Sequence, residues 1–173
     1  MEQLTDEILM AKVAQGNLDV LKILFNRHHK HVFNFLHKMC GDKMLSEDLT
    51  QEVFYKLMKY RSSYNNGKFI SWLFTIARNS MNTHFRRVSK NYEDLDTIDY
   101  KLIVQEEERE DYSDLHLAIN KLDPSDRELV ILNRFQEIKY EELAEIVGST
   151  PGAVKTKVSR ALKKLKTIYI EAN

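Results

Sequence analysis

Apolar residues recur every three or four positions along most of the chain, which is the spacing that places them on one face of an α-helix. The N-terminal half predicts four helices, separated by residues that start or stop a helix. These are a first helix capped by Thr5 and ending near Gly16, a second from about Asp19 to Met39 stopped by Gly41, a third capped by Ser46 and running to about Tyr60, and a fourth from about Phe69.

The third and fourth helices have recognisable inward faces. Leu49, Val53 and Leu57 follow one another at i, i+4 and i+8, so they predict the buried stripe of the third helix. RSSYNNGK (61–68) is predicted to be a loop, because residues that favour turns gather there. The predicted inward face of the fourth helix consists of Phe69, Trp72, Leu73, Ile76 and Ala77.

Residues 113–170 predict a second helical unit, whose first helix ends near Leu122. The next helix begins at Asp123-Pro124 or at Ser125, where Ser125 and Glu128 have the spacing of a capping box. These two starts differ by two residues, and the sequence leaves both open.

The most specific local pattern spans residues 140–165. Ala144 is small, as is needed where two helices cross closely, and Gly148 stands where a helix ends in a left-handed turn. Thr150 then caps a new helix, and Pro151 occupies its first position, where a missing N–H costs nothing. The pattern predicts a helix-turn-helix whose second helix can enter a major groove. The predicted buried stripe of that helix is Val154, Val158, Ala161, Leu162 and Leu165.

The remaining surface of this second helix is basic. Lysine and arginine neutralise phosphates and reach guanine edges, while threonine and serine bond to phosphates or bases. We therefore expect this helix to bind DNA, although a helical hairpin with a solvated lysine face is the alternative. The candidate DNA-binding residues are Lys155, Thr156, Lys157, Ser159, Arg160, Lys163 and Lys164, the last two on phosphate.

Charge is strongly separated along the chain, although 26 basic and 26 acidic residues cancel. Residues 92–114 contain ten acids and two bases, whereas residues 149–170 contain six bases and no acid. Self-repulsion in the acidic stretch predicts an extended linker, with a solvated helix as the alternative. The predicted fold is all-α, with two small helical domains, 1–89 and 113–173, joined by an acidic linker, 90–112.

Two polar surfaces of the first domain are candidates for partner contacts. One is a mainly acidic face of the third helix, for which simple solvation is the alternative. The other lies in residues 72–87, where aromatic residues stand among amides and bases, a mixture that suits single-stranded DNA. Phe69 and Trp72 belong to the apolar stripe, so we expect them in the core. The acidic face consists of Asp48, Gln51, Glu52 and Tyr55, and the aligned polar residues of the second surface are Asn79, Asn82 and Arg86.

Together these segments resemble the bacterial sigma-70 family of transcription initiation factors, in its small extracytoplasmic-function (ECF) branch. SEDLTQEVFYKL (46–57) resembles the segment that grips the clamp of the polymerase largest subunit. FISWLFTIARN (69–79), followed by HFRR (84–87), resembles the segment that melts the promoter and recognises its minus-ten element. Residues 122–166 resemble the fourth conserved region, which binds the minus-thirty-five element and the polymerase flap.

The resemblance implies roles for individual residues. It places Asp48, Gln51 and Glu52 against the clamp, with Tyr55 on the same face. The loop Ser62–Gly67 would hold a flipped promoter base, which costs a few kcal/mol to extrude. Leu129, Leu132 and Phe135 would contribute to the flap-facing surface, with core packing as the alternative. The residues implied in promoter melting are Asn65, Asn66, Asn79, Asn82, Thr83, Arg86 and Arg87.

The sequence thus predicts a sigma factor that directs promoter-specific transcription initiation and is not an enzyme. The implied partners are core RNA polymerase, through its clamp and flap, and promoter DNA, as duplex and as melted non-template strand. Family members are often held by an anti-sigma protein, which is a further candidate partner. The alternative is a stand-alone helix-turn-helix regulator, which would bind a duplex operator tightly in a gel shift without polymerase.

Metal and catalytic chemistry have little support in the sequence. His28, His29, His31 and His37 fall on one helix, but their spacing matches no familiar zinc site and no acidic ligand joins them, so we expect surface histidines. Neither a phosphate-binding glycine loop nor a nucleophile–base pair occurs, and we expect no metal, cofactor or catalytic residue. A single cysteine, Cys40, and the lack of a long apolar run or secretion signal predict a cytoplasmic protein without membrane insertion.

Overall fold

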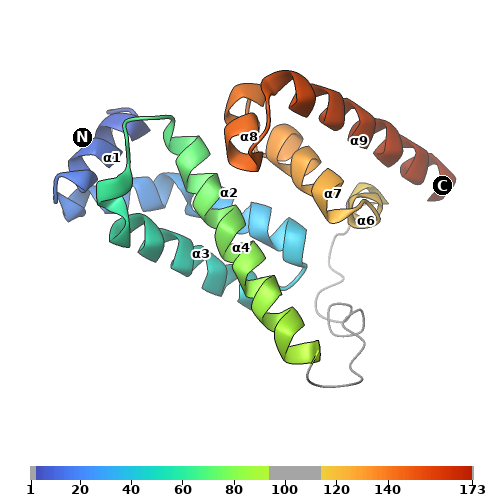
Figure 1. Ribbon diagram of the computed structural model, residues 1–173, viewed down its shortest axis with the longest axis horizontal. Helices are drawn as coiled ribbons and strands as arrows, with labels where there is room; N and C mark the ends of the chain where they lie inside the picture. Colours follow the sequence, from blue (N-terminus) through green and yellow to red (C-terminus); the bar gives the residue numbers. More distant parts are fainter. Residues whose placement is uncertain (1–2, 94–113, 173) are drawn as a thin grey trace. The chain divides into compact units, whose positions relative to one another are not determined.

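A computed structural model describes residues 3–93 and 114–172, which form an N-terminal and a C-terminal helical unit (Figure 1). Within these two ranges the chain forms no strand, and the predicted all-α fold with two helical domains is confirmed. The N-terminal unit contains α1 (Asp6–Ala14), η1 (Leu18–Val20), α2 (Leu21–Cys40), α3 (Lys43–Lys59), η2 (Arg61–Ser63) and α4 (Phe69–Glu93). The C-terminal unit contains α6 (Asp114–Asn120), α7 (Pro124–Val130), η3 (Ile131–Phe135), α8 (Tyr140–Val147) and α9 (Pro151–Ala172).

Three predicted helix boundaries of the N-terminal unit are confirmed. Thr5 caps α1, since its hydroxyl accepts the backbone N–H of Ile8 at 3.3 Å. Gly41 ends α2 in the left-handed region at φ 72°. The fourth predicted helix, α4, starts at Phe69. The first two boundaries depend on a residue beside them in the sequence, which is why the pattern alone identified them.

The predicted start of the third helix was wrong. α3 begins at Lys43, and its N-cap is Asp42, whose carboxylate accepts the N–H of Leu45 at 3.1 Å. Ser46 lies inside the first turn, where it is buried and its hydroxyl donates to the Asp42 carbonyl at 2.6 Å. Asp42 directly follows Gly41, so the turn that ends α2 also supplies the cap of α3.

The core of the N-terminal unit lies where α3 packs against α2 and α4. Leu49, Val53 and Leu57 are buried there, as predicted. Phe35 of α2 and Phe74 of α4 meet edge to face, with ring centroids 5.7 Å apart. On the predicted inward face of α4, the members at every fourth position are buried, whereas Trp72 and Ile76 are half-buried at its margin. The buried members are Phe69, Leu73 and Ala77.

In the C-terminal unit, the two starts that the sequence left open for α7 are now resolved. Pro124 is its first residue and Asp123 precedes it. The capping box of Ser125 and Glu128 does not form, because α7 has begun before Ser125 and the Glu128 side chain is buried. Leu129 and Leu132 are buried too, which supports core packing over a role in the flap-facing surface.

The helix-turn-helix prediction agrees with α8 and α9. Gly148 ends α8 at φ 71°, and the Thr150 hydroxyl accepts the N–H of Ala153 at 3.2 Å at the start of α9. Leu162 was predicted in the buried stripe of α9 but is only half-buried, because it stands at the edge of a groove. The buried stripe consists of Val154, Val158, Ala161 and Leu165.

The predicted acidic linker is largely outside the described residues. α4 continues to Glu93, so residues 90–93 are helical. Residues 94–112, to which the prediction of an extended or a helical linker applies, lie outside the described part of the chain.

Candidate polymerase and DNA interfaces

The exposed side of α3 carries the predicted polymerase-binding residues. Asp48, Gln51 and Tyr55 are exposed, and Glu52 is half-buried beside them. Glu52 pairs with Lys56 one turn later, at 2.8 Å between carboxylate and ammonium. The buried stripe of α3 occupies the opposite side, so these four side chains form one face that is available to a partner.

The loop between η2 and α4 presents the predicted base-binding residues. Asn65 and Asn66 are exposed, and Asn66 adopts a left-handed conformation at φ 57°, which asparagine tolerates better than most residues. The Tyr64 hydroxyl closes the loop by donating to the Gly67 carbonyl at 2.6 Å. The Tyr64 ring is 7% exposed and lies 5.2 Å from the Trp72 ring, so the base of the loop is fixed while its tip is in solvent.

The predicted promoter-melting residues of α4 lie further along that helix. Asn79, Arg86 and Arg87 are exposed, and Asn82 and Thr83 are half-buried. At about 1.5 Å per residue, Asn79 is about 15 Å along the helix axis from Phe69, where the loop ends. The structure therefore does not gather the loop and α4 residues into one cluster. They would contact an extended strand at separate points.

All seven predicted DNA-binding residues of α9 are exposed, on the side of the helix that does not pack in the core. One of them, Lys164, is held by α7, since its ammonium lies 2.9 Å from the Asp126 carboxylate. That hydrogen bond, with the charge of Asp126, raises the pKa of Lys164 above its usual value. Lys164 therefore differs from the other six, which have no ion pair among the described residues.

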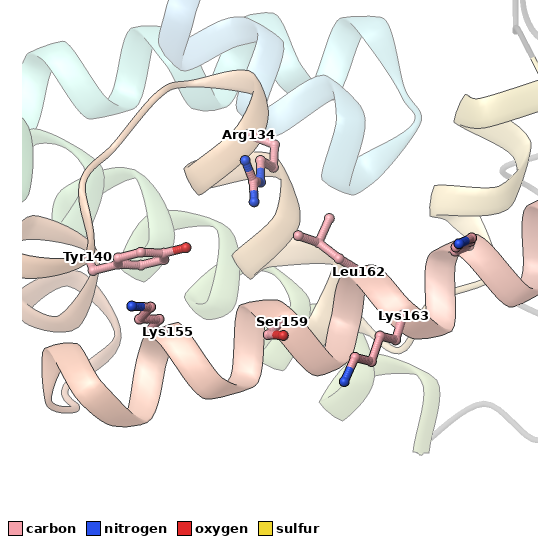
Figure 2. A pocket seen from close by; sticks show the side chains of 7 residues that line it. Arg134, Tyr140, Lys155, Ser159, Leu162 and Lys163 are labelled. Carbon is pink, nitrogen blue, oxygen red and sulfur yellow. The ribbon is translucent and has the colours of Figure 1, made fainter.

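A groove of about 390 Å³ runs beside the exposed face of α9 (Figure 2). Its lining residues come from η3, from the start of α8 and from α9. None of its lining residues is acidic. We call it the basic groove, and it is lined by Arg134, Tyr140, Lys155, Ser159, Leu162, Lys163 and Lys166. Lys155, Ser159 and Lys163 are among the DNA-binding candidates predicted from the sequence, whereas Arg134, Tyr140 and Lys166 are not.

Known proteins resemble the chain over both units. The family model for Sigma-70 region 2 matches residues 24–91, and that for Sigma-70, region 4 matches residues 112–165. The RNA polymerase sigma factor CarQ of Myxococcus xanthus is 31% identical over 168 residues, which cover 94% of this chain and 96% of CarQ. The chain belongs to the sigma-70 family. Sigma factors bind core RNA polymerase and direct it to promoters, and this chain is one of them.

Two further similarities assign this sigma factor to the ECF branch. The ECF RNA polymerase sigma factor SigM of Bacillus subtilis is 29% identical over 155 residues, covering 84% of this chain and 93% of SigM. The sigma factor RpoE of Bartonella quintana, solved in complex with the anti-sigma factor NepR, has a TM-score of 0.71 and 26% identity. That match covers 85% of this chain and 94% of RpoE.

Helix α1 of the sigma factor precedes the family match, yet it carries contacts that sequence analysis missed. The Glu7 carboxylate accepts the N–H of Phe69 at 3.2 Å, at the first residue of α4. The Asp6 carboxylate lies 2.9 Å from the Arg27 guanidinium and 2.8 Å from His28 Nε2 of α2. Two neighbouring acids thus join α1 to the N-terminal half of α2 and to the start of α4. No local signal marks either acid, since both look like ordinary first-turn acids of a helix.

These contacts change the acidity of two side chains. Burial would raise the pKa of Asp6, but hydrogen bonds from His28 and Arg27, with their charges, outweigh it and hold that pKa below its usual value. The pKa of Tyr64 is raised by burial and by the charges of Glu7 and Asp6. Asp6 therefore stays ionised and Tyr64 stays neutral around neutral pH, so the Tyr64 hydroxyl keeps the proton that it donates to Gly67.

The expectation of surface histidines was wrong for His28. His28 is buried, and an acid does join it, although Asp6 comes from another helix. His31 is exposed, and the His29 and His37 rings stack on Phe25 and Phe33. In the described ranges, no group of three histidine, cysteine or acidic side chains is arranged to hold a metal ion. Among the described helices, none has both the length and the hydropathy that a membrane crossing requires.

Proposed function

We propose that the two units of the sigma factor divide the work of initiation. The α3 face (Asp48, Gln51, Glu52, Tyr55) docks on the clamp of core RNA polymerase. The exposed side of α9 enters the major groove of the upstream promoter element. This division of work is supported above all by α9, which presents seven exposed DNA-binding candidates. It follows α8 in a helix-turn-helix whose turn begins at Gly148.

The N-terminal unit also acts on melted DNA in this proposal. The loop tip, with Asn65 and Asn66, receives an unpaired base of the non-template strand. The polar side of α4 follows the strand, where Arg86 and Arg87 neutralise phosphates and amides bond to bases. The fixed base of the loop at Tyr64 supports this role, because a pocket must be preorganised if its contacts are to offset the cost of extruding a base.

The nucleotide chemistry belongs to the polymerase in this mechanism, and the sigma factor itself has no enzymatic activity. It acts in the cytoplasm, where its polymerase is. A protein partner that holds it inactive is expected as well, since its structural relative RpoE was solved with an anti-sigma factor.

Run-off transcription tests the proposal. Purified core polymerase is offered a promoter library with and without the full chain. We expect discrete transcripts only with the chain, and their upstream sequences define its promoter. If no transcript appears and the protein alone binds duplex sites tightly, a stand-alone regulator replaces the proposal.

Two substitutions test the role of α9 in the same assay. Lys155→Ala and Arg160→Ala should each weaken binding to the promoter, and Arg160→Ala should cost about 1–3 kcal/mol, the value of a good base contact. Both side chains are exposed, so binding to core polymerase should not change. Loss of core binding in either variant would contradict the division of work between the units.

A further inference from the structure

The basic groove concentrates positive charge that the fold leaves uncompensated. Arg134, Lys155, Lys163 and Lys166 all line it, and none of them has an ion pair within residues 114–172 or with the described part of the N-terminal unit. Like charges that share a groove repel one another, so they do not stabilise this fold. Their arrangement fits an anion supplied from outside the chain.

The groove uses one side of the exposed surface of α9. Lys155, Ser159 and Lys163 are spaced at i, i+4 and i+8, and Lys166 continues the same stripe three residues later. Thr156 and Arg160 do not line the groove, because they point further round the helix. The exposed side of α9 is thus divided into a groove stripe and a second stripe.

The far side of the groove is formed outside the recognition helix. Figure 2 shows Arg134 and Tyr140 across the groove from α9, with Ser159 on the helix between Lys155 and Lys163. Guanidinium, ammonium, phenol and serine hydroxyl groups are all hydrogen-bond donors, and phosphate oxygens are acceptors. From Lys155 to Lys166 the stripe extends about 16 Å at the rise of an α-helix, which is long enough for more than one phosphate.

We propose that the basic groove is a track for the sugar-phosphate backbone of one DNA strand, in which Arg134, Tyr140 and Lys166 bind phosphates while Thr156 and Arg160 face the bases. This rests on the proposed function, since it requires α9 to enter the major groove. It extends the DNA-binding surface beyond the recognition helix, to η3 and the start of α8. It also separates affinity from specificity: groove contacts strengthen binding to every sequence alike.

The salt dependence of binding tests the track. Holoenzyme, assembled from core polymerase and the full chain, is titrated onto two duplex fragments that carry a preferred and a mutated upstream element, over a series of salt concentrations. Each lost phosphate contact should reduce the slope of log K against log salt by about 0.9. Arg134→Gln and Lys166→Gln should each do so, and the double variant should lose about twice as much.

Both fragments should lose affinity by the same factor in these variants. Lys121→Gln is the matched control, because Lys121 is an exposed lysine of the same unit that does not line the groove. Tyr140→Phe removes only a hydroxyl and should weaken binding without changing the slope, because no charge is lost. The substituted side chains are all exposed or half-buried, so circular dichroism should show unchanged folding. They are Lys121, Arg134, Tyr140 and Lys166.

Two results would overturn the track. An unchanged slope in the double variant would mean that the groove binds no phosphate, and a changed ratio between the two fragments would mean that it contacts bases. A failure of the proposed function is distinguishable from both. In that case Thr156→Ala and Arg160→Ala would also leave the ratio between the fragments unaltered, and the unsubstituted holoenzyme would not distinguish the two elements.

Discussion

The two units of this sigma factor are held together in different ways. In the N-terminal unit, Asp6 and Glu7 of α1 bond to groups up to 62 positions later in the chain. In the C-terminal unit, the polar contacts that define the helix-turn-helix are local, such as the one from Thr150 to Ala153. Charged side chains of α1 therefore join distant elements of the first unit, whereas along α9 of the second unit most of the charge is left on the surface.

This difference separates stability from binding. Removing an internal acid of the N-terminal unit should weaken its fold, while changing a surface charge of either unit should affect a partner and leave the fold intact. Trp72 makes the comparison measurable, because it is the single tryptophan of the chain and belongs to the N-terminal unit. Its fluorescence reports unfolding of that unit alone.

The largest expected effect is on polymerase binding. Asp48→Lys combined with Glu52→Lys reverses two charges of the α3 face, and like charges across an interface cost several kcal/mol. We expect binding to core polymerase to weaken more than about a hundredfold. The Glu52–Lys56 pair is a surface pair of the kind that contributes about 0.3–0.5 kcal/mol, so the Trp72 unfolding transition should hardly move.

Asp19→Lys is the control for this variant, since Asp19 is an exposed acid of η1 and not of α3. It should bind core polymerase normally. Unimpaired binding of the double variant would remove the α3 face from the interface. A large shift of the Trp72 transition would instead show that surface charge stabilises the N-terminal unit, and the contrast between the units would fail.

Asp6→Ala should have the next largest effect, on stability. It removes hydrogen bonds to Arg27 and His28, and bonds to charged groups are worth about 1.5–3 kcal/mol, so we expect a loss of about 2 kcal/mol in the free energy of unfolding. Urea unfolding followed by Trp72 fluorescence measures it. Asp19→Ala, which removes an exposed acid of the same unit, should have little effect.

The pH dependence of the same experiment has a definite sign. The pKa of Asp6 is lowered on folding, so its contribution is complete above the ordinary value of 3.8 and is lost as pH falls through the lower pKa of the folded state. The difference in stability between the wild type and Asp6→Ala should therefore shrink as pH falls below 3.8. A difference that grows below pH 3.8 would exclude the ionised Asp6 as its cause.

Gly148→Ala should have a smaller effect, confined to the C-terminal unit. A Cβ at Gly148 meets nothing within 4 Å, so the cost is only that of a left-handed backbone, about 1 kcal/mol. Amide hydrogen exchange in α8 and α9 should rise, while the Trp72 transition stays unchanged. Gly148→Asn should recover part of the loss, since asparagine enters this conformation more readily than alanine.

Features of the structure that depend on neighbours in the chain were predictable from the sequence. Thr5, Gly41, Gly148 and Thr150 each act within four residues, and the apolar stripes follow from helical spacing. The charge of α9 was predictable for the same reason, because one helix determines which of its side chains share a face.

The misses share a cause too. Asp6 bonds to His28 across 22 positions and Glu7 to Phe69 across 62, so neither partner can be identified before the packing of α1 is known. Leu162 fits the spacing of a buried residue, but the groove between α9 and η3 leaves it half-exposed. Arg134 likewise becomes a candidate only when the fold sets it opposite α9. A site formed by residues of several elements can be predicted only when the packing of those elements is known, and helical periodicity does not specify that packing.

The smallest expected effect concerns Lys164, the α9 lysine whose charge is compensated by Asp126. Asp126 raises the pKa of Lys164, so Lys164 stays protonated at neutral pH, where binding is measured. Lys164→Gln should therefore leave the salt slope of promoter binding nearly unchanged, in contrast to Arg134→Gln. Asp126→Asn should have the opposite sign, because it releases Lys164 for a phosphate and can steepen the slope by up to about 0.9. If Lys164→Gln instead reduced the slope as much as a groove variant, Lys164 would exchange Asp126 for a phosphate when DNA binds. In that case the charged α9 lysines would all contribute to DNA binding.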